Sequence, residues 1–257
     1  LEHDRIVGTS MVLAQLGRRG APYIYFDVMD EEKYSATIDK HFHHKVLRIG
    51  YSYNGPTEIG GLVIHPDYRN RLHLAMPELP EVETTRLGLL PRLQGHTLRH
   101  IVVRNPRLRW PVPEDLEARL AGRSLKGLSR RGKYLLFDFG GVTQIVHLGM
   151  SGSLRFAEPD EPAALHDHVD WLFDDGTILR LRDPRRFGAV LWTDDVARHP
   201  LLAHLGPEPL TSAFNVTYLH AQCRHRNTAI KQFIMDAQVV VGVGNIYASE
   251  SLFHAGI

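Results

Sequence analysis

The spacing of apolar and polar residues changes character several times along the chain. Residues 5–16 and 22–28 are rich in β-branched and aromatic side chains, which favours strands. Residues 57–71 show the same texture as far as Pro66, where we expect the strand to stop. The beginning of the chain is therefore predicted to be β-rich.

A helical period replaces this texture at residue 77. Leu79 and Val82 open a run of apolar residues at roughly helical spacing, and acidic residues crowd its first turn, where they suit the helix dipole. Pro77 suits the first helical position. Gly88 and Pro91 are expected to limit this helix to a few turns.

Short apolar runs broken by glycine or polar residues follow the helix. They include LRHIVVRN, KYLLFDF, TQIVHLGM, SGSLRF, HVDWLF, TILRLR and FGAVLW. The sequence Asp174-Asp175-Gly176 lies between two of them and is typical of a hairpin turn. Closely spaced strands without helices between them predict a β-sandwich or a barrel.

The period becomes helical again from about residue 206. Two helices are predicted within residues 209–223 and 227–238, with Ser212 and Asn227 as N-caps, and a third begins at Ile246 after a glycine-broken turn. The prediction is an α+β protein in three parts: residues 1–75, a β-sandwich domain at 76–205 with a helix at its N-terminus, and a helical domain at 206–257.

Composition narrows the class of protein. The 257 residues include 43% hydrophobic residues, which is enough for a substantial core, and no apolar run approaches the length of a membrane span. The first residues lack the layout of a secretory signal. Cys223 is the single cysteine, so neither an internal disulfide nor a four-cysteine zinc site can form, and a reducing cytoplasm is expected.

Charge is informative through its clustering. The formal net charge is only +1, but basic residues gather within 104–109, 123–133, 180–186 and 224–231. Each such cluster is compatible with an ordinary solvated surface, and also with the binding of phosphates.

Pro77-Glu78 is a candidate for covalent chemistry. A proline nitrogen is a secondary amine only at a chain terminus, where it can attack a carbon and form an imine-type intermediate. Glu78 could then manage protons beside it. Within a longer chain, Pro77 need do no more than begin a helix.

Eight ordered sequence blocks favour the chemical interpretation. They are PELPEVE (77–83), RRGKYLL (130–136), HLGMSG (147–152), HDH (166–168), DPRRFG (183–188), HLGPEPL (204–210), TAIK (228–231) and GVGNIYASESLF (242–253). With them, the chain from Met76 onward closely resembles formamidopyrimidine-DNA glycosylases, base-excision enzymes for oxidised purines. A related glycosylase family with a preference for oxidised pyrimidines is the close competitor.

The resemblance implies catalytic roles for three residues. Pro77 matches the family's nucleophile at the anomeric carbon, and Glu78 matches the acid that assists ring opening. Lys133 matches a lysine that contacts phosphate and assists base loss or strand cleavage. Glu81 is expected to support the geometry of the Pro-Glu turn.

The resemblance also implies contacts with damaged double-stranded DNA. Met150, Arg185 and Phe187 match the side chains that fill the space left by an extruded nucleotide. The phosphate-contacting positions are matched by His166, Arg226 and Lys231, and Asn245 matches a contact in the loop of a helix–two-turn–helix motif. No membrane partner is implied, and a monomer is expected.

The sequence departs from this family in two places. The family continues into a four-cysteine zinc finger with a further DNA-contacting arginine, which we expect to be absent here together with its zinc, so no cofactor is expected. Residues 1–75 instead resemble an internal piece of arginine N-succinyltransferases, which use acyl-CoA. Arg69-Asn70-Arg71 stands where a glycine turn would hold the CoA pyrophosphate, and the histidines at 41–44 are not expected to bind metal.

The function expected from the resemblance is therefore that of a DNA glycosylase with abasic-site lyase activity. In the full chain Pro77 is joined to Met76 through a tertiary amide, so we expect imine formation to be blocked or impaired. Three alternatives stay open: a non-catalytic protein that binds damaged DNA, a fragment of a CoA-dependent arginine acyltransferase, and a fusion of two partial proteins without function.

Overall fold

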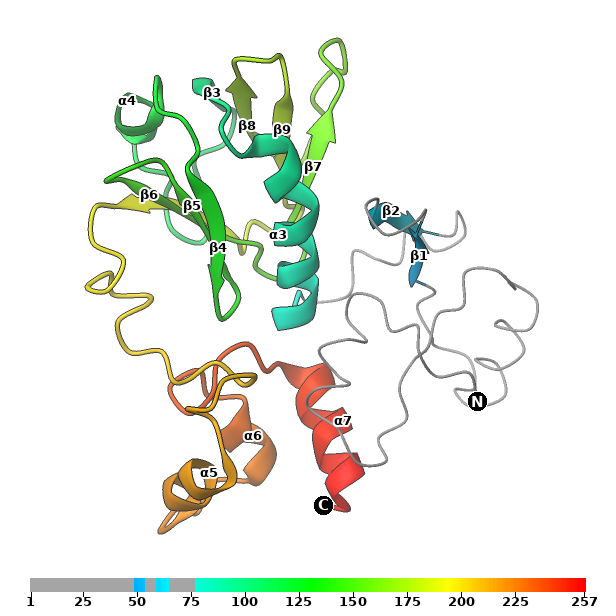
Figure 1. Ribbon diagram of the computed structural model, residues 1–257, viewed down its shortest axis with the longest axis vertical. Coiled ribbons are helices and arrows are strands. Elements are labelled where there is room, and N and C mark those ends of the chain that lie inside the picture. Colours follow the sequence, from blue (N-terminus) through cyan, green and yellow to red (C-terminus); the bar gives the residue numbers. More distant parts are fainter. Residues whose placement is uncertain (1–48, 54–58, 65–76) are drawn as a thin grey trace, which may run out of the picture. The chain divides into compact units, whose positions relative to one another are not determined.

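The computed structural model describes residues 49–53, 59–64 and 77–257, and the chain separates into two compact units, Leu1–Ala75 and Met76–Ile257 (Figure 1). In the first unit, β1 (Ile49–Tyr53) and β2 (Ile59–Ile64) form an antiparallel pair. β2 lies within the strand predicted for residues 57–71. The strands predicted at 5–16 and 22–28, the histidines at 41–44 and Arg69-Asn70-Arg71 lie outside the described residues.

Helix α3 (Leu79–Leu93) begins the second unit. Its N-cap is Glu78, whose backbone N–H donates to the Glu81 carboxylate over 2.9 Å, as in a capping box. The first helical position therefore belongs to Leu79, and the expectation that Pro77 occupies it is wrong. The helix also runs two residues beyond Pro91, because Leu89 and Leu93 are buried in the core and their packing holds the last turn.

The strands of this unit form two antiparallel four-stranded sheets. One has the order β10-β6-β5-β4, and the other has the order β3-β8-β9-β7. Their bounds are β3 Leu98–Val103, β4 Gly127–Arg131, β5 Tyr134–Asp138, β6 Thr143–His147, β7 Ser153–Ala157, β8 Asp167–Phe173, β9 Ile178–Arg182 and β10 Ala189–Thr193. Residues Asp174–Thr177 connect β8 to β9, as the hairpin signal predicts.

One core joins the two sheets to α3. Val82, Leu89 and Leu93 of the helix cluster with buried residues of both sheets, among them Leu135 and Trp171. The sequence prediction missed a short helix, α4 (Leu116–Leu120), which lies between β3 and β4 and buries Leu116 and Leu120 in the same core. Its five residues are too few to show a helical period.

The last part of the chain is helical and contains α5 (Val216–Cys223), α6 (Ile230–Ile234) and α7 (Asn245–Ala255) (Figure 1). Two predicted caps are wrong. Asn215 caps α5 by accepting the Tyr218 N–H, while Ser212 lies three residues earlier, and the N-cap of α6 is Ala229 rather than Asn227. A separate small core, which includes Phe233, Val240 and Ala248, holds these helices together. No helix among the described residues is long and apolar enough to cross a membrane.

Candidate functional site

The Pro77–Glu78 turn is held against the beginning of α7. The Glu78 side chain is fully buried, and its carboxylate accepts backbone N–H groups from Gly244 (2.7 Å), Ile246 (2.8 Å) and Tyr247 (3.2 Å). A helix N-terminus presents unpaired N–H groups and a positive dipole end, so it stabilises a carboxylate at this position. Pro77 itself is partly exposed.

Two glycines allow this close approach. A Cβ on Gly242 would lie 2.4 Å from the Leu79 side chain, and a Cβ on Gly244 would lie 2.4 Å from Cδ of Glu78. The Leu79 N–H also donates to the Gly242 carbonyl over 3.1 Å. The structure thus gives these two glycines a role inside the protein, because they let the helical part of the chain contact the Pro77–Glu78 turn.

Glu81 supports the same turn, as expected. Its Oε2 accepts the Glu78 N–H over 2.9 Å, and its Oε1 accepts the Tyr247 hydroxyl over 3.2 Å. Burial raises the pKa of the Glu81 carboxyl above its usual value, against the opposing effect of these hydrogen bonds. The Glu81 side chain thus joins α3 to α7 next to the Pro77–Glu78 turn.

Lys133 lies in the two-residue turn of the β4–β5 hairpin, after Gly132 with its φ of +56°. Burial lowers the pKa of the Lys133 ammonium, while the nearby carboxylates of Glu78 and Glu81 act in the opposite direction. Lys133 therefore lies near enough to Glu78 and Glu81 for their negative charges to act on its ammonium.

Glu208 fixes this hairpin, and the sequence interpretation did not single it out. Its carboxylate accepts the Gly132 N–H over 2.7 Å and pairs with Arg130 and Arg131 at 2.8 and 2.9 Å. Arg130 also pairs with Glu83 of α3 at 2.9 Å. The sequence shows that these charged residues exist, but nothing in it indicates that Glu208 contacts Arg131, which lies 77 positions earlier.

His147 is a second residue that sequence reasoning missed. It lies opposite Tyr134 in the β5–β6 register, and its Nδ1 accepts the Gly149 N–H over 3.0 Å. Burial, with the positive charges of Lys133 and Arg109, lowers the pKa of His147 to about 4. The ring is therefore neutral at pH 7, and its Nε2 carries the hydrogen, because Nδ1 is the acceptor.

The three residues expected to fill a DNA void lie on two loops. Phe187 is 42% exposed, and the Arg185 guanidinium lies 4.8 Å from the centre of its ring. Met150 is half-buried on the loop that follows β6. Ser151 joins the loops, because its hydroxyl accepts the Arg185 N–H over 3.1 Å.

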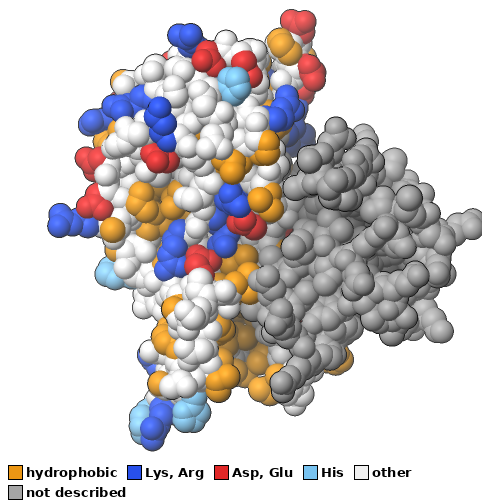
Figure 2. Space-filling model, in the orientation of Figure 1, with side chains coloured by type: hydrophobic (Ala, Val, Ile, Leu, Met, Phe, Trp, Pro, Cys, Tyr) orange, Lys and Arg blue, Asp and Glu red, His pale blue; other side chains and the backbone are white. Residues whose placement is uncertain are grey.

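The four expected phosphate-binding residues lie on separate segments. His166 is half-buried before β8, Arg226 is exposed after α5, Lys231 is half-buried in α6, and Asn245 is the exposed first residue of α7. Asn245 adjoins the N–H groups that hold Glu78. The hydrogen bonds that hold the Pro77–Glu78 turn do not involve His166, Arg226 or Lys231. Figure 2 shows basic side chains spread over the visible face rather than in one field.

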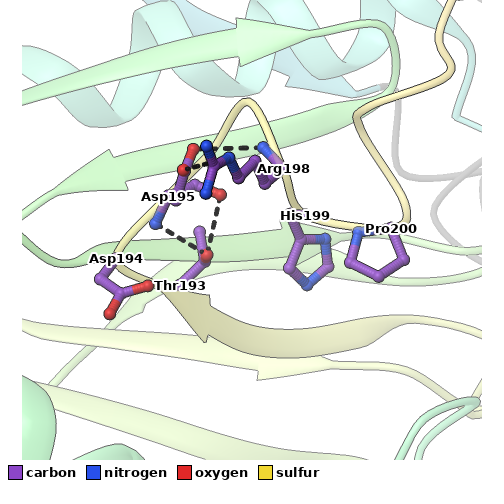
Figure 3. Close-up of a pocket in the computed structure, with 6 residues that line it drawn as sticks. All are labelled: Thr193, Asp194, Asp195, Arg198, His199 and Pro200. Carbon is purple, nitrogen blue, oxygen red and sulfur yellow. Dashed lines mark hydrogen bonds and ion pairs between the residues drawn. The ribbon is translucent and has the colours of Figure 1, made fainter.

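A hollow of about 530 Å³ lies elsewhere, at residues 193–200 after β10 (Figure 3). Two of its charged residues, Asp195 and Arg198, pair with each other at 3.5 Å, and the Thr193 hydroxyl donates to the Asp195 carbonyl. None of the expected site residues lines it. We therefore place the candidate site at the Pro77–Glu78 turn and not in this hollow.

One cluster of side chains among the described residues has the composition of a metal site. His96, Asp174 and Asp175 come close enough to share an ion, but both aspartates are exposed and each already pairs with the half-buried His96. The 257 residues include one cysteine, Cys223, so they do not themselves supply the ligands of a four-cysteine zinc site.

Comparison with known proteins gives matches over nearly the whole chain. Residues 76–190 match the profile of the formamidopyrimidine-DNA glycosylase N-terminal domain, and residues 205–257 match the formamidopyrimidine-DNA glycosylase H2TH domain. Residues 1–77 match the arginine N-succinyltransferase beta subunit.

Individual proteins show the same likeness. A formamidopyrimidine-DNA glycosylase of Thiobacillus denitrificans is 75% identical over 182 residues, which is 71% of this chain and 67% of that protein. One from Acidithiobacillus ferrooxidans is 59% identical over the same shares. The solved Lactococcus lactis enzyme, non-covalently bound to DNA with an AP site, has a TM-score of 0.64 and 36% identity, covering 68% of each chain. The MutM (Fpg) protein of Thermus thermophilus has a TM-score of 0.60 and 40% identity over 69% of this chain and 64% of that one.

Proposed function

Because the chain belongs to the formamidopyrimidine-DNA glycosylase family through residues 76–257, we propose that this unit excises oxidised purines from duplex DNA and nicks the abasic site. The substrates are 8-oxoguanine and formamidopyrimidines. The observation that carries the proposal is the turn in which buried Glu78 is held at the N-terminus of α7, next to Pro77 and within the field of Lys133. Two Lactococcus lactis complexes with N7-benzyl-Fapy-dG DNA are consistent with this substrate class.

The chemistry begins with the lone pair of a free Pro77 nitrogen. It attacks C1′ of the damaged nucleoside, and the bond from C1′ to the base breaks. The base leaves with that electron pair and takes up the proton that the Pro77 nitrogen loses, which restores the nitrogen lone pair. The C1′–O4′ bond then opens as O4′ receives a proton, for which Glu78 is the donor, and an iminium forms between Pro77 and C1′. Loss of a C2′ proton expels the 3′ phosphate, and water releases the sugar from the amine.

Lys133 serves this sequence in two ways. Burial lowers the pKa of its ammonium, so the neutral amine that can take a proton is more accessible than for an exposed lysine. In its charged form it stabilises the negative charge that develops on phosphate or base. The Glu208 contacts keep the hairpin turn that carries it in place.

The remaining expected residues bind the DNA. Met150 and Phe187 hold the kinked stack apart after the nucleotide leaves it, and the Arg185 guanidinium hydrogen-bonds the unpaired partner base. His166, Arg226, Lys231 and Asn245 contact phosphates. No step of this chemistry passes through zinc or another cofactor.

We assign the catalytic role to residues 76–205 and the DNA-gripping role to residues 206–257. The helical part holds Glu78 through N–H groups at the beginning of α7, and it carries Arg226, Lys231 and Asn245 for the proposed phosphate contacts. Residues 1–75 form a separate acyltransferase-like segment, for which we propose no CoA chemistry. The expected setting is a monomer in the cytoplasm, working on damaged chromosomal DNA.

The peptide bond between Met76 and Pro77 controls this activity. Its nitrogen lone pair is delocalised into the amide, so Pro77 of the intact chain cannot form an iminium. We therefore propose that the intact chain binds damaged DNA without excising the base, and that exposing Pro77 activates it. Residues 76–257 form a compact unit with its own cores, so this unit can be tested alone.

Borohydride trapping tests the proposal. The intact chain and a version that begins at Pro77 are incubated with an 8-oxoguanine duplex and borohydride, and intact mass identifies each N-terminus. A covalent adduct is expected only with the version that begins at Pro77, and an adduct mapped to Pro77 of the intact chain would contradict the amide argument. If neither version forms an adduct or nicks DNA but both bind the lesion, the second candidate function, non-catalytic lesion binding, replaces the first.

A further inference from the structure

Asp183 connects the two loops that carry Met150, Arg185 and Phe187. Its side chain is fully buried, with Oδ1 accepting the Ser151 hydroxyl over 2.7 Å and Oδ2 accepting the Gly188 N–H over 2.8 Å. The Ser151 hydroxyl in turn accepts the Arg185 N–H over 3.1 Å. A single chain of hydrogen bonds thus runs from the Met150 loop to the Arg185 loop.

The backbones of these loops are also in direct contact. A Cβ on Gly149 would lie 2.4 Å from the carbonyl carbon of Phe187, and a Cβ on Gly188 would lie 2.7 Å from the His147 carbonyl oxygen. Protein interiors packed this closely do not deform continuously. Neither loop can therefore slide past the other without breaking the Asp183 contacts.

Asp183 also holds a strained backbone between the exposed side chains. Arg186 has a φ of +57°, an uncommon conformation for a residue with a side chain. Its N–H donates to the Asp183 carbonyl over 3.1 Å, and the same carbonyl interacts with Nε2 of His168 at 2.8 Å. The buried anchor thus fixes the direction in which Arg185 and Phe187 leave the surface.

We infer that Asp183 and Ser151 are positioning residues that make Met150, Arg185 and Phe187 one rigid wedge rather than three independent side chains. This inference rests on the proposed binding of damaged DNA, and it deepens that proposal by assigning lesion selectivity to a buried hydrogen bond. A wedge held in advance loses little conformational entropy when it enters the stack. A loosened wedge would enter damaged DNA less favourably, while phosphate contacts with undamaged DNA would be unchanged.

Ser151→Ala is the direct test, in the intact chain, because binding does not need the Pro77 amine. The dissociation constants for an 8-oxoguanine duplex and for the same undamaged duplex are measured by fluorescence anisotropy at one fixed salt concentration. In Ser151→Ala we expect the dissociation constant for the 8-oxoguanine duplex to rise about tenfold, while the constant for undamaged DNA stays unchanged. Ser153→Ala is the matched control, since Ser153 is an exposed serine two residues away.

Pairwise substitution separates positioning from simple loss of stability. The effects of Met150→Ala and Phe187→Ala on lesion binding are compared singly and together, first in the unmodified chain and then in the Ser151→Ala background. In a rigid wedge the two effects are non-additive while Ser151 is present, and they become additive once Ser151→Ala is introduced. A general loss of stability would not remove this coupling selectively.

The possible outcomes separate the inference from the proposed function. An unmodified chain that does not prefer the lesion overturns the binding proposal itself. If the unmodified chain prefers the lesion, and Ser151→Ala keeps either this preference or the coupling between Met150 and Phe187, only the inference of a rigid wedge is overturned. Should Ser151→Ala fail to give a cooperative melt, Asp183→Asn provides the same comparison at nearly constant volume, with an intermediate loss of selectivity expected.

Discussion

Gly244→Ala tests how closely the Pro77–Glu78 turn depends on α7. The new Cβ would lie 2.4 Å from Cδ and 2.5 Å from Oε1 of Glu78, well inside van der Waals contact. Gly244 has φ −127° and ψ −160°, which any residue adopts, so the effect comes from this overlap and not from backbone strain. Glu78 is fully buried, and it can move away only by breaking its hydrogen bonds.

The expected loss follows from those bonds. Hydrogen bonds to a charged group contribute about 1.5–3 kcal/mol each, so breaking two of them destabilises the unit by at least about 3 kcal/mol. For a unit of this size each kcal/mol lowers Tm by about 2–4 °C, which predicts a fall of about 6–12 °C. Thermal melts followed by circular dichroism measure it, on the version that begins at Pro77.

The matched control is Gly88→Ala. Gly88 lies inside α3, and no atom is within 4 Å of its added Cβ, so alanine should raise the unfolding free energy by about 0.4–1 kcal/mol. Base excision by Gly88→Ala should stay near the unmodified rate, whereas excision by Gly244→Ala should fall. A melt of Gly244→Ala within about 2 °C of the unmodified protein would refute the reasoning, since the carboxylate would then not need its N–H partners.

Three further substitutions follow from the charges around the site. The pKa of His147 is lowered from 6.5 to about 4, so the folded protein resists protonation of this ring while the unfolded chain does not. The free energy of unfolding should therefore fall by about 3 kcal/mol as the pH falls from 6.5 to 4. Urea titrations at several pH values measure this loss, and His147→Gln should lack it. Glu208→Gln should lower stability by about 2 kcal/mol in urea because it unpairs partly buried arginines, whereas Asp195→Asn, in an exposed pair, should change it little. Lys133→Met should raise Tm at pH 7 by removing a charge that burial disfavours, yet slow borohydride trapping.

Much of the fold follows from local pattern. The strands of both sheets and the β8–β9 hairpin are readable because apolar runs and turn residues act over a few positions. The errors lie where packing overrides local preference. Pro91 does not end α3 because Leu93 is buried beyond it, and the α5 cap is Asn215 because the helix begins later than the apolar pattern suggests.

The sequence predicts only part of the candidate site. Motif resemblance picks out Pro77, Glu78 and Lys133, since these residues lie within recognisable blocks. Sequence motifs do not identify Glu208 and His147, because the importance of these residues comes from partners that meet them only when the chain folds. No local pattern encodes a contact between residues 77 positions apart.

Glu78 joins the chemistry of the site to its architecture. The carboxylate proposed to deliver a proton to O4′ is the one that accepts three N–H groups at the beginning of α7. Glu78 therefore serves the proposed proton delivery and the docking of the helical part with the same side chain. Substituting Glu78 alters both at once, whereas Lys133→Met changes the chemistry and leaves those N–H contacts intact. Comparing α7 amide exchange in Gly244→Ala and Lys133→Met should therefore separate the two, with faster exchange expected only in Gly244→Ala.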